Sequence, residues 1–145
     1  MDVDVSATRD YYNSITDSEL CGCGYCRNYR LQIKSALPEV TAYLDSFGID
    51  IEKPFETSLL EPNENGMLEY CGCQYIAFGN CDLEYRHRIG DVEFRIATSY
   101  PSTGIEQEHF VIELHPVQLK FICKIQLMFV KPIFAETLSK KGHRK

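Results

Sequence analysis

The spacing of apolar residues in the first third of the chain predicts two short helices. Apolar side chains recur at steps of three and four from Tyr29 to Phe47, which places them on one face of a helix. Pro38 interrupts the series, and proline disrupts a helix interior but is favoured in the first turn of a new helix. We therefore expect two helices that meet at Leu37-Pro38. The second should end at Gly48, where a left-handed residue lets Ile49 pack back on the last turn.

In the second half of the chain the apolar period changes from 3.6 to 2, which predicts strands. The clearest pair is a hairpin of residues 83–89 and 92–97, joined by the two-residue turn Gly90-Asp91. In this register His87 faces Phe94, and we expect both on the buried side. Further strands are expected over residues 70–78, 110–114 and 117–129, with an extended piece at 55–60.

These elements predict a single α+β domain over residues 1–145, with two short N-terminal helices packed on an antiparallel β-sheet of about five strands. The chain is long enough to bury a core of its own. Residues 1–20 are polar, and we expect irregular structure or a short helix there. This segment and the basic stretch 139–145 are expected to be peripheral.

The composition excludes several classes of protein. A net charge of −6 argues against general nucleic-acid binding, which needs a basic face. Nothing approaches the ~20 apolar residues of a membrane span. The start of the chain lacks the basic and apolar regions of a signal peptide, so we expect a cytoplasmic protein. In that reducing compartment cysteines are thiols or metal ligands rather than a disulfide framework.

Four cysteines have a spacing that fits a structural zinc site. Cys23 and Cys26 form a C-x-x-C knuckle, and Cys71 and Cys73 offer two more thiolates. If the loop and the strand meet, one Zn²⁺ bound by these four would join the helices to the sheet. The alternative is that they are small buried side chains, as cysteines in proteins often are.

A second alternative for Cys23-x-x-Cys26 is thiol redox chemistry. A helix N-terminus favours the thiolate, because the helix dipole places positive charge there. The preceding residues include Asp17 and Glu19, whose carboxylates would oppose a thiolate. Thioredoxin-like sites also have a buried strand before the motif, and this segment is polar.

Asn28 and three tyrosines are candidate ligand-binding residues. Asn28 stands where the helical pattern starts, so we expect it to accept a hydrogen bond from a free N–H of the first turn. The alternative is that its amide contacts a ligand near Tyr75. Tyr70, Tyr75 and Tyr85 lie on neighbouring predicted strands and offer flat apolar bodies with polar tips, which suits a pocket. Their alternative places are the edge of the core and the sheet surface.

Three segments carry a resemblance to a known family. They are Cys23-Gly-Tyr-Cys26-Arg-Asn28-Tyr29, then Phe47-Gly-Ile-Asp50 followed by Lys53-Pro54-Phe55-Glu56, and then residues 70–79. Together they resemble a family of short uncharacterised bacterial proteins with a C-x-x-C-x-N-aromatic start, a G-I-D…K-P-x-E middle and a strand rich in glycine and aromatic residues. The resemblance implies no activity. Cys71 and Cys73 stand where the family pattern has glycine and an aromatic residue, so a four-cysteine site would be particular to this chain.

The sequence contains no recognisable catalytic motif, and we predict no catalytic residue. We expect a non-enzymatic binding or interaction module, with a structural zinc on its cysteines and a homodimer or protein partner. The alternative is a small enzyme or thiol-redox protein that uses the Cys23-x-x-Cys26 loop and a tyrosine-lined pocket. A concave site with convergent titratable side chains would favour the enzyme. A flat apolar patch repeated across a two-fold axis would favour the interaction module.

Overall fold

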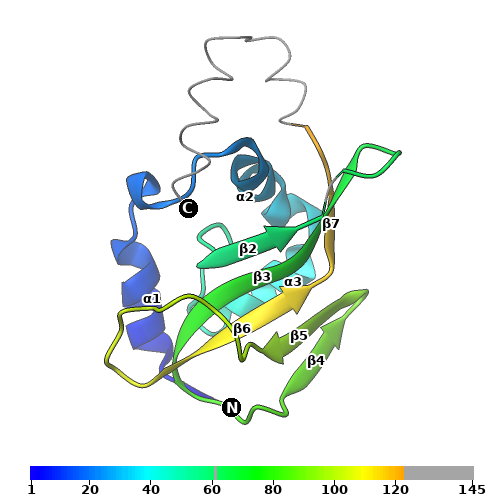
Figure 1. Cartoon of the computed structure of the whole chain (residues 1–145). Helices are drawn as coiled ribbons and strands as arrows, with labels where there is room; N and C mark the ends of the chain where they lie inside the picture. The colour runs from blue at the N-terminus through cyan, green and yellow to red at the C-terminus, as the bar shows by residue number, and fades with distance from the viewer. Residues whose placement is uncertain (61, 123–145) are drawn as a thin grey trace.

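Helices α2 and α3 lie against one face of an antiparallel sheet, which is the α+β architecture predicted from the sequence (Figure 1). The structure is a computed structural model in which residues 1–60 and 62–122 are described. The helical elements are α1 (Val5–Ser14), the 3-10 helix η1 (Asp17–Glu19), α2 (Gly24–Ala36) and α3 (Pro38–Asp45). The strands are β1 (Asp2–Val3), β2 (Glu56–Leu59), β3 (Met67–Asn80), β4 (Arg86–Ile89), β5 (Val92–Ile96), β6 (His109–His115) and β7 (Val117–Lys120).

Strand β3 is the centre of the sheet, because its 14 residues are enough to pair with several shorter strands. Within the described ranges, β1 and β2 pair along one edge of β3, and β6 and β7 pair along the other. The sheet then continues from β6 through β5 to β4. The predicted strands at 70–78 and 110–114 and the extended piece at 55–60 correspond to β3, β6 and β2. The strand predicted over 117–129 is β7 as far as Lys120, and residues 123–129 lie outside the described part of the chain.

Helix α1 is the short helix that was one of the two alternatives for residues 1–20, and it covers an edge of β3. Because Tyr12 belongs to the core, the predicted peripheral position of this segment is wrong. The Tyr12 hydroxyl donates to the Ile76 carbonyl at 2.7 Å, and the Thr8 hydroxyl accepts the Phe78 N–H at 3.0 Å. Thr8 and Tyr12 are one helical turn apart, and both are buried. β6 pairs with β3 here along one edge, but on the other edge no described strand lies between the ends of β2 and β1. Two side chains of α1 therefore satisfy backbone groups that a strand on that edge would otherwise bind.

The two predicted helices meet where the sequence analysis placed them. Helix α2 ends at Ala36, and Pro38 is the first residue of α3. Helix α3 ends at Asp45, three residues before the predicted end. Gly48 has a φ of +87°, and the Ile49 N–H donates back to the Leu44 carbonyl at 3.1 Å, which confirms the predicted left-handed residue and the return of Ile49 to the last turn. The helices bury their apolar faces against the sheet, and the largest core side chains are Tyr12, Tyr29, Tyr70, Tyr75 and Phe94.

The predicted hairpin is confirmed in its register but not in the burial of His87. Ile89 pairs with Val92 and His87 pairs with Phe94 across the Gly90-Asp91 turn. Phe94 is fully buried, whereas His87 is exposed, so its predicted burial is wrong. The reason is that β4 is the outer strand of the described sheet, with cover on one side only (Figure 1). The His87 imidazole stacks on the ring of Tyr43, with centroids 4.4 Å apart.

Candidate functional site

Three cysteines gather at the start of helix α2. The Sγ atoms of Cys21, Cys23 and Cys26 all lie within 4.8 Å of one another. Cys21 and Cys23 are half-buried, and Cys26 is buried. Six of the seven cysteines belong to the described part of the chain, and no disulfide joins any two of these six. Three close thiols form a donor set that can hold one metal ion.

The local backbone explains why these thiols converge. Cys23 is the N-cap of α2, and its Sγ accepts the backbone N–H of Cys26 at 3.4 Å. The C-x-x-C spacing therefore places both side chains on the first turn of the helix, where N–H groups lack partners within the helix. Arg30, one turn further along α2, donates from Nη1 to the Cys21 carbonyl at 2.8 Å. This bond holds the preceding loop against the helix and brings Cys21 beside the other two.

The environment of Cys23 favours its thiolate. A hydrogen bond from the Cys26 side chain, with a further one from the Cys26 backbone N–H, lowers the pKa of Cys23 to about 7 from its ordinary value of 9.0. Partial burial and the neighbouring Cys21 oppose this change. The net effect favours the thiolate of Cys23, which is the form that binds metals and attacks disulfides.

A cavity of about 510 Å³ opens beside the cysteines. Its wall combines thiols, charges and apolar side chains, contributed by Asp17, Ser18, Glu19, Leu20, Cys21, Gly22, Cys26, Arg30, Pro54 and Phe55. The volume lies in the range of sites for small molecules. The cavity brings η1 and the cysteine loop together with the segment that leads into β2.

The structure does not bring the four predicted zinc ligands together. Cys21 joins Cys23 and Cys26, and no other group of three or more potential ligands this close occurs among the described residues. Cys73 is fully buried in the core, where its thiol contacts the Tyr29 hydroxyl. Cys71 is the residue of β3 that is skipped where the register with β2 shifts, since Gly72 pairs with Ser58 and Tyr70 with Leu59. Strand β3 is thus committed to the sheet and does not meet the loop with both thiols.

Asn28 has a different role from the predicted cap. Helix α2 starts at Gly24, so Asn28 lies inside the helix, and it is fully buried. Its Nδ2 donates to the Lys120 carbonyl at 2.9 Å, and its Oδ1 accepts the Ile122 N–H at 2.8 Å. The amide also approaches the Tyr70 hydroxyl at 3.4 Å. Asn28 therefore ties α2 to the end of β7, and the capping prediction is wrong.

Two of the three candidate tyrosines occupy the core. Tyr70 and Tyr75 are fully buried, and burial raises the pKa of both hydroxyls. The Tyr70 hydroxyl donates to the Tyr25 carbonyl, and the Tyr75 hydroxyl donates to the Ile51 carbonyl, both at 2.6 Å. Tyr85 is half-buried near the outer strand, and its hydroxyl contacts that of Tyr43. Tyr70 and Tyr75 thus lie inside the core, deeper than the core edge that stood as the alternative to a pocket, and Tyr85 lies near the edge of the sheet.

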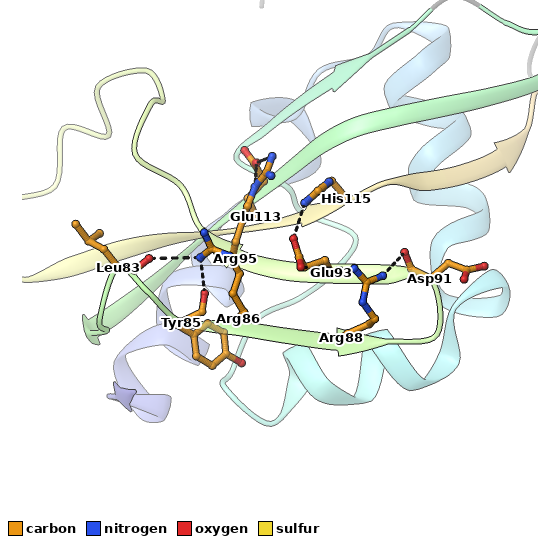
Figure 2. A network of polar contacts seen from close by, with 9 residues as sticks. All are labelled: Leu83, Tyr85, Arg86, Arg88, Asp91, Glu93, Arg95, Glu113 and His115. Atoms are coloured by element: carbon orange, nitrogen blue, oxygen red, sulfur yellow. Dashed lines mark hydrogen bonds and ion pairs between the residues drawn. The ribbon is translucent and has the colours of Figure 1, made fainter.

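A second polar cluster lies on the sheet face opposite the helices (Figure 2). Arg95 donates from Nε to Glu113 at 2.7 Å, and His115 Nε2 lies 3.1 Å from Glu93. Both pairs join residues that face each other across strands β5 and β6, and the charges of Arg95 and Glu113 neutralise one another where the strands pair. The adjacent Gln74 is buried, and its Oε1 has no hydrogen-bond partner among the described residues. We interpret this cluster as support for the sheet.

Comparison with known proteins does not identify the function of this site. Within residues 1–60 and 62–122, no helix has the length and apolar content to cross a bilayer. The resemblance over residues 23–79 to short bacterial proteins stays a prediction. Scans against protein-family models, curated proteins and solved structures gave no match to this chain.

Proposed function

We propose that this chain is a small, non-enzymatic binding protein that holds one thiophilic metal ion, zinc in the first instance, on Cys21, Cys23 and Cys26. The observation that carries the proposal is the convergence of three Sγ atoms within 4.8 Å of one another. In tetrahedral zinc sites the Zn–S bonds are about 2.3 Å, which sets two sulfurs about 3.8 Å apart. The loop needs only a small contraction to reach that geometry.

The position of the thiols suggests a binding site rather than the predicted staple between helices and sheet. All three ligands lie within residues 21–26, so a bound ion would order this loop without joining distant parts of the chain. Three protein ligands also leave one position of a tetrahedral ion open, which is typical of sites that exchange or activate a ligand.

The test is metal binding by the purified full-length chain under a phosphine reductant, in the absence of thiol reagents. We expect elemental analysis to give one zinc per chain, and competition with a chromophoric chelator to give its affinity. Changing any one of Cys21, Cys23 or Cys26 to serine should weaken zinc binding by about tenfold or more, since one of three ligand bonds is lost. The matched controls Cys71→Ser and Cys81→Ser should bind zinc like the unchanged protein.

Zinc affinity equal in all five variants, or loss of binding in the controls alone, contradicts this site. Retention of zinc after all three loop cysteines are changed together would contradict it most directly. Because Cys26 is buried, the far-ultraviolet circular dichroism of each variant is compared first, so that loss of folding is not read as loss of a ligand.

The second candidate is a dithiol that exchanges with disulfides, and the hydrogen bond from Cys26 N–H to Cys23 Sγ favours it. Cys23 would attack one sulfur of a substrate disulfide and release the other as a thiolate. Cys26 would then attack Cys23, which leaves an intramolecular disulfide and a fully reduced substrate. A Cys23–Cys26 disulfide found by mass spectrometry after equilibration with a glutathione buffer supports this candidate. Oxidation scattered over all seven cysteines counts against it.

The wider setting is part of the same proposal. Thiols that bind metal must stay reduced, which agrees with the cytoplasmic location expected from the sequence. The net charge of −6 supports partners other than nucleic acid. The bacterial affiliation and the predicted homodimer or protein partner stay predictions, and the oligomeric state is open to measurement by light scattering.

A further inference from the structure

The cavity beside the cysteine loop is lined by thiols, charged groups and apolar side chains. Cys21 and Cys26 form part of its wall, so two of the three proposed metal ligands face this space. An ion on the loop would therefore have the cavity beside it. Apolar cover comes from Leu20, Pro54 and Phe55.

Arg30 gives the cavity a cation. The guanidinium is anchored by the bond from Nη1 to the Cys21 carbonyl at 2.8 Å, and the side chain is half-buried. No ion pair of Arg30 occurs among the described residues. A guanidinium has five N–H donors in a planar fork that fits a carboxylate, so most of its binding capacity is left for a ligand.

The same cavity also has acidic residues on its wall, namely Asp17 and Glu19 of η1. Glu19 accepts a hydrogen bond from the Thr16 hydroxyl at 3.2 Å through Oε1. A cavity with a guanidinium and carboxylates matches a ligand that carries both charges. Among ligands of that kind, one with a soft donor atom suits a site whose remaining wall is formed by thiols.

We propose that this cavity binds a low-molecular-weight thiol of amino-acid type, whose sulfur becomes the fourth ligand of the metal ion on Cys21, Cys23 and Cys26. This inference rests on the proposed metal site and names its ligand. Arg30 pairs with the carboxylate of the thiol, and the acidic residues of η1 lie on the side of its ammonium group. Leu20, Pro54 and Phe55 cover the carbon atoms between these groups.

The exchange at the metal is a ligand substitution without electron transfer. The sulfur of the thiol replaces a bound water molecule and its proton passes to solvent, so one metal–sulfur bond forms as one metal–oxygen bond breaks. No fourth His, Cys, Asp or Glu among the described residues joins the three cysteines. The described residues therefore leave the fourth position of the ion to a ligand from outside this part of the chain.

The first experiment measures binding of matched small molecules to the cobalt-loaded or cadmium-loaded protein by its charge-transfer absorption. L-Cysteine and cysteamine share the thiol and the ammonium group and differ in the carboxylate. We expect L-cysteine to bind about tenfold more tightly, as a charge-assisted bond from a partly buried guanidinium allows. S-Methylcysteine, which has no ionisable sulfur, should fail to change the absorption.

Variants then locate the carboxylate. In Arg30→Ala the ratio of L-cysteine to cysteamine affinity should fall towards one, and in Arg30→Lys it should be intermediate. Arg30 also holds the Cys21 carbonyl, so its loss could disturb the metal site itself. Such a disturbance affects L-cysteine and cysteamine alike, and for that reason the ratio of their affinities is the quantity to compare. Lys34→Ala is the matched control: this cation lies one turn further along α2, pairs with Glu52 at 3.7 Å and does not line the cavity. Its ratio should equal that of the unchanged protein.

The outcomes separate the two proposals. The thiol inference is overturned if L-cysteine and cysteamine bind with equal affinity, or if their affinity ratio is unchanged in Arg30→Ala. The metal site is tested separately, and zinc binding in thiol-free buffer upholds it. Binding of S-methylcysteine with the same absorption change overturns the assignment of sulfur as ligand. Absence of metal binding in thiol-free buffer overturns both.

Discussion

Asn28 binds the backbone at Ile122: the Oδ1 atom of its side chain accepts the Ile122 N–H at 2.8 Å, 94 positions further along the chain. On its other side the amide donates to the Lys120 carbonyl, which Gln32 also reaches at 2.7 Å. One buried side chain of α2 therefore satisfies two backbone groups where β7 ends. The two bonds also give the buried Asn28 amide the partners that a buried polar group needs.

We expect Asn28→Ala to lower the free energy of unfolding by about 2–4 kcal/mol, because it removes the buried amide together with its bonds to Lys120, Ile122 and Tyr70. The measurement is urea unfolding followed by circular dichroism. Gln32→Ala is the matched control, since it removes a bond to the same carbonyl from a more exposed position, and it should cost less than about 1 kcal/mol. Equal effects of the two changes would contradict the role given to Asn28.

The hydroxyl of Tyr75 lies between the Tyr29 hydroxyl and the Ile51 carbonyl, each at 2.6 Å, in the centre of the core. Tyr75→Phe should therefore cost about 1–3 kcal/mol, since it leaves a buried carbonyl and a buried hydroxyl each short of a partner. Tyr85→Phe removes a hydroxyl at a half-buried position and should cost under about 1 kcal/mol. Thermal unfolding of both variants compares the two, and a larger loss for Tyr85→Phe would count against this account of the core.

The cysteines of the metal-free protein should differ in their reactivity with pH. Hydrogen bonds from Cys26 lower the pKa of Cys23 to about 7, whereas burial raises the pKa of Cys81 above its ordinary value of 9.0. Alkylation of Cys23 should reach half its maximal rate near pH 7, and alkylation of Cys81 only above pH 9. Peptide mapping by mass spectrometry after brief treatment with iodoacetamide gives both rates in one sample.

The same pKa difference links folding to pH with a defined sign. The pKa of Cys23 is lower in the folded chain than in the unfolded chain, so folding releases a proton between about pH 7 and 9. The contribution of Cys23 to stability is present above its ordinary pKa of 9.0 and is lost as the pH falls through about 7. Cys23→Ser should reduce the rise in stability over this interval, and an unchanged pH profile would argue against the hydrogen bonds from Cys26.

Removal of metal should leave the fold intact. The proposed ligands lie within residues 21–26, so the unfolded chain keeps them close and also binds the ion, which reduces the stabilisation that zinc gives to the native state. We expect near-ultraviolet circular dichroism to be the same with zinc and with a chelator. Zinc-dependent protection from hydrogen exchange should be confined to the cysteine loop and the first turn of α2. A chain that unfolds on chelation would contradict the local character of the site.

Local sequence signals were sufficient to predict the positions of several helices and strands. The 3.6-residue spacing, Pro38 and Gly48 act within one or two turns, so they located α2 and α3 without knowledge of the rest of the chain. The Gly90-Asp91 turn located the hairpin in the same way. Alternation along β4 also gave the side on which His87 lies. Which strand is outermost depends on the order of the whole sheet, and for that reason the exposure of His87 was missed.

The cysteine site could be predicted from the sequence only in part. The distances among Cys21, Cys23 and Cys26 follow from a loop and one helical turn, and the Cys21-Gly-Cys23 spacing was a signal that could have included Cys21. Whether Cys71 and Cys73 reach the same place depends on how a loop meets a strand 50 positions away, which no local pattern encodes. Helix α1 was hard to predict because only Thr8 and Tyr12 of its residues are buried, although Asp4 supplies an N-cap by accepting the Ala7 N–H at 3.0 Å.

The two hydroxyls of α1 that bind the backbone at Ile76 and Phe78 also protect this protein against aggregation. The backbone of an unpaired strand is a template on which a strand of a second chain can add, and such additions propagate into aggregates. Residues 74–78 of β3 are apolar apart from Gln74, so an open edge here would readily pair with a strand of another molecule. Thr8 and Tyr12 occupy its hydrogen-bonding positions with side chains, which offer no further backbone to a neighbour. A molecule whose first helix had detached would thus be the aggregation-prone form of this protein, even with the rest of its core still in place.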